Sequence, residues 1–445
     1  MTVTPETPES APTASAATPI DPEQHPALAR PSRSTPIAVV AALAVGALVG
    51  GVSGAGVAIW ATSLNSGTPV VDSSSPTTIT VNDPANVTPV TAIAAKASPS
   101  VVTISVSSES AGGTGSGVIL DTEGHVLTNA HVITLEGASG SDPRIMVTSY
   151  DGRLFSATIV GVDPLSDLAV IKLDNPDDLV PAEFGDSAAL NVGDTAVMIG
   201  APLGLSASVS DGIISALNRS ITVASSAIPE EVVDELEQQD PTVPENDNTS
   251  PFDIWNFDVP GDGTEDATPP SALSSSTISL AVIQTNAGIN PGSSGGALVN
   301  DEGQVIGINV ALATSGGTSE QAGSIGIGFA IPANFAQRIA AELMETGTAT
   351  HGLLGASVAD VTEDPSQTDA EVIGASIMEI TAGGAAEKAG LQVGDVVTGV
   401  NGLPITGKTD LTAQIRALPA GAEAVISYVR GGKSETVEVI LGTLI

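Results

Sequence analysis

Short runs of β-branched residues, separated by turn-forming residues, dominate the chain from about residue 93 onward. Val, Ile and Thr favour strands because their side chains pack well on a pleated surface, whereas Gly, Asn and Asp favour turns. The pattern predicts an all-β barrel or sandwich, interrupted once and resumed from Ile278 to Ile331. The first seven runs are Val101–Val106, Gly117–Leu120, His125–Asn129, Ile145–Thr148, Ala157–Val162, Leu168–Leu173 and Thr195–Ile199.

A helix and then a small α+β unit are predicted after the β region. Apolar residues on one face predict the helix at about Ala333–Glu345. The unit at 349–445 combines short strands with an amphipathic helix around Leu411–Leu418 and a tight turn at Asn401-Gly402. We therefore expect two folded domains, 91–348 and 349–445.

The N-terminal part of the chain has a different character. Residues 1–36 are rich in Thr, Pro, Ala and Ser and predict a disordered tail, and 61–90 predicts a linker. The 24 residues 37–60 carry no charge, and as a helix they would span about 36 Å, enough for a hydrocarbon core of about 30 Å. Arg30 and Arg33 precede this run, which predicts a cytoplasmic tail and an uncleaved signal-anchor. A cleaved signal peptide is the alternative.

Composition excludes several classes of function. The chain has 51 acidic and 13 basic residues, a formal charge of −38, and no cysteine. Such a negative chain repels phosphate, so we expect no nucleic-acid partner. Without cysteine, a thiolate metal site and a cysteine nucleophile are excluded. We find no metal-ligand cluster and no nucleotide-binding loop, and we expect neither a metal nor a cofactor.

An acidic segment interrupts the β pattern at 221–280. It contains thirteen acidic residues and no basic one, together with Pro, Ser and Asn clusters. We interpret it as a long surface insertion that is largely disordered. Its role remains open: it would repel acidic substrates, act as a lid, or be an inert, salt-tolerant loop.

Three residues in chain order predict a serine nucleophile with its base and orienting carboxylate. His131 follows a strand, Asp167 directly precedes an apolar strand, and Ser294 lies in the run Gly292-Ser293-Ser294-Gly295-Gly296. Flanking glycines let such a loop turn sharply and point several N–H groups into one volume. Ser293 is a rival nucleophile. A serine of ordinary acidity needs an adjacent base, and the base needs an orienting group.

The sequence around these residues resembles the HtrA (DegP-like) family of serine proteases. The resemblance covers roughly 93–445, apart from the acidic insertion. Its three catalytic blocks are Thr128-Asn129-Ala130-His131-Val132, Ser166-Asp167-Leu168-Ala169-Val170 and Gly292-Ser293-Ser294-Gly295-Gly296-Ala297-Leu298. Two further stretches, Gly113–Ile119 and Ile325–Pro332, resemble the segments before the family's histidine and at its late substrate-pocket loop.

The resemblance implies a chymotrypsin-like fold of two six-stranded β-barrels with the site between them. His131 is then the general base, Asp167 its orienting group and Ser294 the nucleophile. The N–H groups of Gly292, Ser293 and Ser294 would form the oxyanion hole. The family usually has Asn before the nucleophile, where this chain has Ser293.

Substrate-binding residues follow from the same resemblance. Ile289 and Ile327 would form a small apolar pocket, which suits Val, Ala or Leu. The terminal unit resembles the family's PDZ domain, whose loop grips a terminal carboxylate while the peptide adds as a strand. The residues at that loop are Leu353, Leu354, Gly355 and Ala356.

The expected function is therefore a serine endopeptidase that degrades misfolded or damaged extracytoplasmic proteins. Its partners would be unfolded protein substrates, peptide C-termini at the PDZ domain and the membrane, through one helix. Family resemblance implies a homo-oligomer, specifically a trimer. The alternative is a PDZ chaperone or stress sensor whose protease site is dormant.

Overall fold

The computed structural model describes residues 87–108, 111–135, 143–201, 208–225, 276–310, 326–367 and 371–444. The expected tail, membrane anchor and most of the linker lie outside these residues, as does 226–275 of the acidic insertion. Among the residues that are described, no helix is both long enough and apolar enough to span a bilayer.

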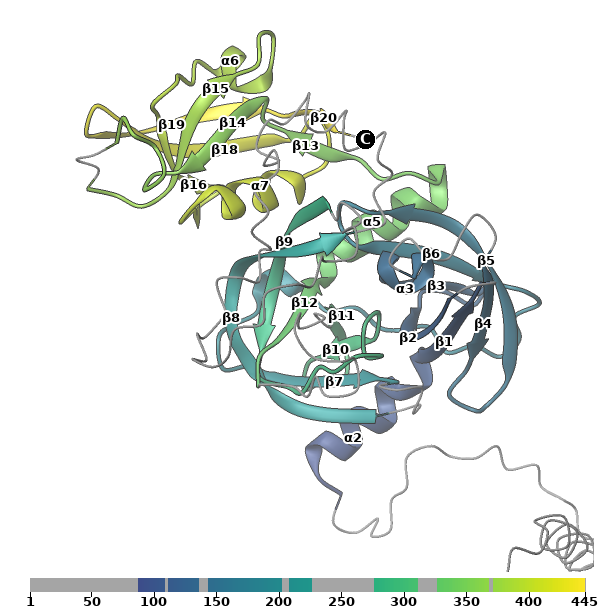
Figure 1. Ribbon diagram of the computed structural model, residues 1–445. Coiled ribbons are helices and arrows are strands. Elements are labelled where there is room, and N and C mark those ends of the chain that lie inside the picture. The colour runs from purple at the N-terminus through teal and green to yellow at the C-terminus, as the bar shows by residue number, and fades with distance from the viewer. Residues whose placement is uncertain are drawn as a thin grey trace, which may run out of the picture. The chain divides into compact units, whose positions relative to one another are not determined.

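The first barrel is closed by six antiparallel strands in the order β1-β2-β3-β6-β5-β4 (Figure 1). Its interior is filled by side chains such as Ile104, Ile133 and Ile171, all fully buried. Because aromatic residues are scarce, these aliphatic side chains provide most of the buried surface. The strands are β1 Val101–Ser107, β2 Gly112–Ile119, β3 His125–Thr128, β4 Arg144–Thr148, β5 Leu154–Asp163 and β6 Leu168–Leu173.

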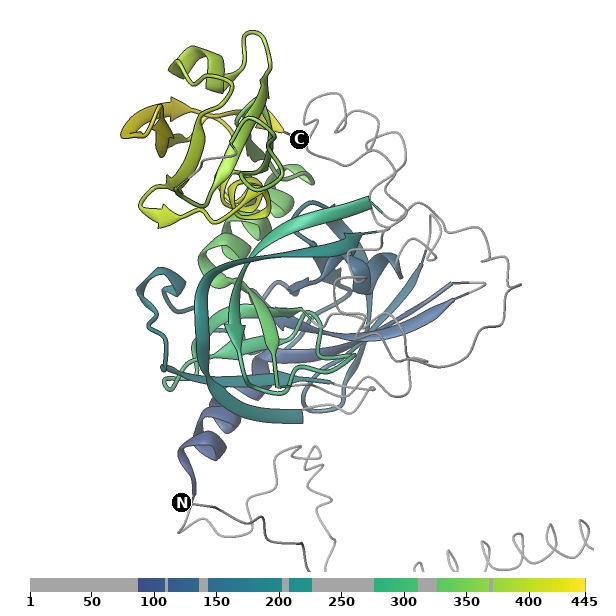
Figure 2. The same cartoon turned by 60° about the vertical axis from the view of Figure 1, so that its left-hand side comes forward.

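A second six-stranded barrel follows, in the order β10-β11-β12-β9-β8-β7. Figure 2 shows its two longest strands, β8 and β9, running side by side. The strands are β7 Thr195–Gly200, β8 Ser208–Ser225, β9 Ser276–Thr285, β10 Ala297–Val299, β11 Val305–Val310 and β12 Gly328–Pro332. The predicted all-β protease architecture is thereby confirmed as two barrels.

The two barrels share one apolar core. Leu127 and Leu168 of the first barrel belong to the same buried cluster as Ile199 and Ala297 of the second. This packing fixes one barrel against the other, so residues at facing strand ends meet reproducibly.

The acidic insertion is shorter than the sequence pattern predicted. Strands β8 and β9 continue to pair from Ile221 opposite Leu280 to Ser225 opposite Ser276. Val223, Ile278 and Leu280 are buried with Leu444, and this apolar contact keeps both ends of the segment in strands.

Two helices flank the barrels. Helix α2, Pro89–Ala97, was not predicted, and it begins inside the expected linker. The Thr88 hydroxyl caps it by accepting a hydrogen bond from the Thr91 N–H (3.2 Å), and Pro89 occupies its first turn. Helix α5, Ala333–Thr346, confirms the predicted helix and ends at Gly347, which adopts the left-handed conformation.

The terminal unit is built around a five-stranded path, β14-β15-β16-β18-β19, with β14 at one edge. Short strands β13 (His351–Leu353) and β20 (Gly442–Leu444) pair separately. The predicted turn at Asn401-Gly402 and the predicted helix α7 (Lys408–Arg416) are both present. The remaining elements are β14 Ala356–Asp360, β15 Ala375–Ile380, α6 Ala385–Ala389, β16 Val396–Val400, β17 Leu403–Pro404, β18 Glu423–Arg430 and β19 Lys433–Ile440.

Candidate active site

His131 lies at the start of the short helix α3, Ala130–Thr134, directly after β3. Asn129, directly before this helix, has an extended backbone. The chain therefore changes direction between β3 and α3, and His131 lies beyond the end of the strand. The Ala130 N–H donates to the carbonyl of Asp167 (3.1 Å), and so does the Asn129 side-chain amide (2.9 Å). These two bonds hold the histidine segment against the residue expected to orient it.

Asp167 ends the tight turn that joins β5 to β6. Its φ is +52°, a conformation that few residues other than glycine adopt, and it is 7% exposed. Its Oδ2 lies 2.8 Å from Nδ1 of His131, and its Oδ1 accepts from the His131 backbone N–H at 3.0 Å. A carboxylate only accepts hydrogen bonds, so Nδ1 carries the proton and the neutral ring keeps its lone pair on Nε2.

Ser294 lies in the loop before β10. Gly292 and Gly295 both have positive φ (+89° and +81°), which explains the glycines on either side. The Gly295 N–H donates to the carbonyl of Asn309 on β11 (2.9 Å), which ties the loop to the second barrel. The Ser293 side chain is fully buried, whereas Ser294 retains 4% exposure, which favours Ser294 over its rival.

Ser116 on β2 connects this loop to the first barrel. Its backbone N–H donates to the carbonyl of Ser294 (2.8 Å), and its hydroxyl donates to the carbonyl of Gly292 (2.8 Å). The same hydroxyl accepts from the Ala201 N–H (2.8 Å). The Ser116 carbonyl accepts from the hydroxyl of Thr128, three residues before His131. The structure thus brings the Ser294 loop onto the strand end that carries His131.

Ser293 is the one expected oxyanion donor that the structure argues against. Its N–H donates to the carbonyl of Asn290 (2.9 Å) within a turn. The same peptide unit is fixed at its other end, because the carbonyl of Gly292 accepts from Ser116. A planar peptide held at both ends cannot also point its N–H into the hole.

The expected pocket residues lie close to this loop. Ile289 is 7% exposed, and its side chain packs so tightly on Gly328 that a Cβ there would lie 2.9 Å from it. Ile327, the neighbour of Gly328, is 40% exposed. Ile289, which is buried, thus packs on Gly328, and the exposed Ile327 directly precedes Gly328 in the chain.

A groove lies in the terminal unit between the edge strand β14 and helix α7. The four expected carboxylate-binding residues line it, with Gly355 in a left-handed conformation (φ +71°). The full lining is Gly352, Leu353, Leu354, Gly355, Ala356, Val358, Leu411, Thr412, Ile415 and Arg416. An edge strand beside such a groove can accept a peptide as a further strand.

Three positions in and around these sites were not predicted as functional. Ser116 lay within a glycine-rich stretch noted only for its resemblance, and Asn129 lay in a catalytic block without a role. No role was expected for His351, yet it is 1% exposed and its Nε2 lies 3.1 Å from Oδ1 of Asp163. No local sequence signal marks such long-range contacts.

Two closed β-barrels, a histidine bonded to an aspartate, and a glycine-flanked serine loop bonded to Ser116 on β2 define a trypsin-like serine protease. A family model for a trypsin-like peptidase domain matches residues 115–246, and a PDZ-domain model matches 352–441. The serine protease PepD of Mycobacterium tuberculosis H37Rv is 37% identical over 415 residues, covering 90% of this chain and 77% of PepD. The periplasmic serine endoprotease DegP of Escherichia coli K12 is 35% identical over 331 residues, covering 74% of this chain but only 56% of DegP.

A solved structure of the HtrA-type protease AlgW with a tripeptide aligns with a TM-score of 0.52 and 29% identity. It covers 80% of this chain and 97% of AlgW. The chain belongs to the HtrA family of serine proteases and is a serine endopeptidase with one PDZ domain.

Proposed function

We propose that Ser294 is the nucleophile, His131 the general base and Asp167 the group that orients His131. The observation that carries the proposal is the paired contact between Asp167 and the Nδ1 and backbone N–H of His131. It leaves Nε2 to take the serine proton as the hydroxyl attacks the scissile carbonyl, and to return it to the leaving amine.

The oxyanion donors in this proposal are the N–H groups of Gly292 and Ser294. The Ser293 N–H is left out because of its turn bond to Asn290. Loss of one such donor costs about 2.7–4 kcal/mol of transition-state stabilisation in a comparable protease.

For specificity, we propose that Ile289 and Ile327 face the side chain preceding the cleaved bond. No acidic residue lies in the stretch from 286 to 290, so Lys and Arg are disfavoured there. An apolar pocket discriminates by only about 1–3 kcal/mol per methylene, so cleavage after Val, Ala or Leu would be broad.

At the PDZ groove, we propose that the backbone of 353–356 binds the terminal carboxylate of a peptide. The peptide would pair with the free edge of β14, with its apolar side chains against Leu411 and Ile415 of α7.

We also propose the domain arrangement and location that the sequence predicts. Residues 37–60 would anchor the chain in the cell membrane, with 91–348 and 349–445 outside the cytoplasm. The periplasmic relative supports an extracytoplasmic location. Unfolded proteins would be the substrates. The family supports a homo-oligomer.

The test is cleavage of casein and labelling by a fluorophosphonate probe, using the purified full chain. Ser294→Ala should abolish both, whereas Ser293→Ala should retain both, since the Ser293 hydroxyl is buried. If the probe does not label the wild-type chain, the result would favour the alternative function, a PDZ chaperone or stress sensor whose protease site is dormant. Loss of labelling in Ser293→Ala alone would overturn the nucleophile assignment.

A further inference from the structure

A fully buried asparagine contacts the backbone of the candidate catalytic aspartate. Asn129 lies between β3 and α3 and is 0% exposed. Its side-chain amide donates to the carbonyl oxygen of Asp167 at 2.9 Å, although the two residues are 38 positions apart in the chain. A buried polar side chain is stable only where it is hydrogen-bonded, so this contact accounts for an asparagine at a position without solvent.

The amide nitrogen of Asn129 is the donor in this contact. A carbonyl oxygen only accepts hydrogen bonds, so the opposite orientation of the amide would place two acceptors, Oδ1 and the Asp167 oxygen, against each other. Among the residues that the structure describes, Oδ1 of Asn129 has no hydrogen-bond partner. Within this part of the chain, the bond to Asp167 alone therefore sets the orientation of the amide.

Two donors from adjacent residues hold the Asp167 carbonyl. The Ala130 N–H donates to it at 3.1 Å, beside the Asn129 amide, so both lone pairs of the oxygen are used. Asp167 needs this support because its φ is +52°, a left-handed conformation that a residue with a Cβ keeps only when its surroundings fix it. Asn129 therefore stabilises the strained residue at the end of the turn.

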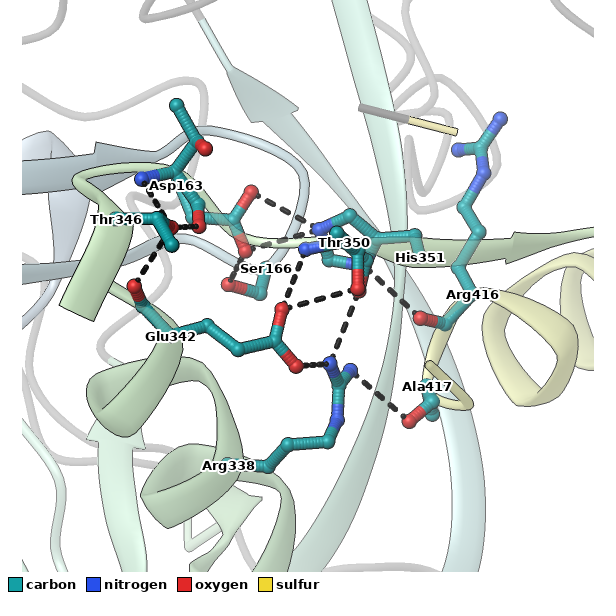
Figure 3. Close-up of polar contacts among 10 residues, drawn as sticks. Asp163, Ser166, Arg338, Glu342, Thr346, Thr350, His351, Arg416 and Ala417 are labelled. Carbon is teal, nitrogen blue, oxygen red and sulfur yellow. Dashed lines mark hydrogen bonds and ion pairs between the residues drawn. The ribbon is translucent and has the colours of Figure 1, made fainter. Parts of the chain in front are cut away.

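The other side of this turn is held by Asp163 (Figure 3). The Ser166 hydroxyl donates to Oδ2 of Asp163, and the Leu165 N–H donates to Oδ1 at 3.2 Å. Ser166 directly precedes Asp167 and is fully buried. The turn is thus restrained on both sides of Asp167, by Asp163 before it and by Asn129 after it.

The direction of the carboxylate follows from this backbone. The Cα–Cβ bond of Asp167 takes its direction from the two peptide planes that flank it, and the second plane carries the carbonyl bonded to Asn129. A rotation of that plane would turn the carboxylate away from His131, whose Nδ1 lies 2.8 Å from Oδ2 and 3.0 Å from Oδ1. Asn129 lies two residues before His131, so one residue fixes both the candidate base and the group that orients it.

The serine loop packs on the same residue. An added Cβ at Gly295 would lie 3.2 Å from the backbone nitrogen of Asn129. Because Gly295 directly follows Ser294, the three candidate catalytic segments meet around Asn129. Neither isoleucine of the expected substrate pocket takes part in these contacts, so a substitution of Asn129 is expected to change the chemical step and not substrate binding.

We propose that Asn129 is a positioning residue for the reaction: the amide donor of its side chain fixes the left-handed backbone of Asp167 and so directs the carboxylate at His131. The proposal rests on the role of Asp167 proposed above. It differs from a merely structural role because it requires a hydrogen-bond donor at this position and links that donor to the contact between Asp167 and the His131 ring.

The first test compares Asn129→Asp with Asn129→Ala in the purified full chain. Asn129→Asp keeps the shape of the side chain but places an acceptor against the Asp167 carbonyl, whereas Asn129→Ala removes the donor without adding a charge. With a chromogenic peptide substrate, both variants should lower kcat about ten- to a hundredfold with little change in KM, and Asn129→Asp should lose more. If Asn129→Asp does not fold, Asn129→Ala supplies the same readout.

The second test observes the contact between His131 and Asp167 without turnover. The proton on Nδ1 of His131, hydrogen-bonded to a carboxylate, should give a low-field resonance in the proton NMR spectrum of the wild type. Loss of this resonance in Asp167→Asn identifies it. In Asn129→Ala the resonance should move to higher field or disappear, because the hydrogen bond becomes longer and exchanges faster with solvent.

Asn309→Ala is the matched control for the loss of a buried asparagine. Asn309 is also 0% exposed, and its amide also donates to a backbone carbonyl, that of Ala297 at 3.0 Å. Its Oδ1 likewise has no hydrogen-bond partner in the described part of the chain. Because Ala297 lies on β10 and not beside Asp167, Asn309→Ala should lose a comparable stability in urea unfolding yet keep the low-field resonance.

Three results would overturn the proposal. The first is a kcat of Asn129→Asp and Asn129→Ala equal to that of the wild type. The second is a low-field resonance that is absent from the wild type or unchanged in Asn129→Ala. The third is an equal loss of the resonance in Asn309→Ala, since the resonance would then follow stability. Failure of the proposed function looks different, because the wild type would lack fluorophosphonate labelling while its resonance still depended on Asn129.

Discussion

Asp167 contacts His131 through both carboxylate oxygens: Oδ2 lies 2.8 Å from Nδ1 of the ring, and Oδ1 lies 3.0 Å from Nδ1 and 3.0 Å from the backbone N–H. Because both oxygens contact the histidine, the carboxylate is fixed in its orientation as well as in its distance. The position of the ring is therefore determined by the turn that bears Asp167 rather than by the short helix α3 alone.

Asp167→Asn should reduce kcat about 10⁴-fold, as the equivalent change does in another triad protease. The amide can donate to Nδ1, which would stabilise the tautomer that carries its proton on Nε2. Asp174→Asn is a suitable control, because Asp174 is exposed just beyond the end of β6. Steady-state kinetics with a peptide substrate measure the change, and a loss below about tenfold would contradict the role of Asp167.

Ser116→Ala should lower kcat by about ten- to a hundredfold while the fold is retained. The hydroxyl bonds both the Gly292 carbonyl and the Ala201 N–H, so its removal releases the peptide unit that precedes Ser293. The control is Ser105→Ala, an exposed position on β1. Equal kcat values for the two variants would show that Ser116 does not position the oxyanion loop.

Gly295→Ala should abolish fluorophosphonate labelling of Ser294. An added Cβ would lie 2.2 Å from the Ser116 carbonyl oxygen and 2.3 Å from the Thr128 hydroxyl, neither of which can move without breaking its own bonds. Gly193→Ala separates this clash from backbone strain, since Gly193 also has positive φ (+99°) but nothing within 4 Å of its Cβ position. Fluorophosphonate labelling and circular dichroism of both variants distinguish the steric clash of the added Cβ from the strain of a positive φ.

The strands, the helix α5 and the three candidate catalytic positions were predictable because each has a local cause. Alternating apolar residues define the strands, and Ser294 lies between glycines that the loop needs for positive φ. The same local patterns predicted the turn at Asn401-Gly402. Propensity and turn chemistry agree with the tertiary fold at these positions.

Contacts between distant residues could not be predicted in this way. The Ser116 hydroxyl bonds Gly292, 176 positions away, and neither residue is unusual in its local sequence. His351 looks like a residue between domains until β13 pairs with β20 and buries it. The predicted bounds of the acidic insertion, 221 and 280, were wrong for a similar reason. The residues at both ends form strands because they pack against Leu444.

Glu342→Gln should destabilise the protein at neutral pH, with a loss that disappears in acid. Burial would raise the pKa of Glu342, but hydrogen bonds from the Thr350 N–H and from Arg338, with the charge of Arg338, together lower that pKa below its usual value. Because the folded pKa lies below the unfolded pKa of about 4.3, the carboxylate stabilises the fold above that pH. The contribution is lost as the pH falls through the folded pKa.

Urea unfolding of wild type and Glu342→Gln across pH 3–7 measures this dependence. The carboxylate is 25% exposed, so we expect the difference in free energy of unfolding to be about 1 kcal/mol at pH 7 and to approach zero near pH 3. Glu345→Gln, an exposed position on the same helix, should show no such trend. A difference that stays constant with pH would mean that Glu342 acts through its shape and not through its charge.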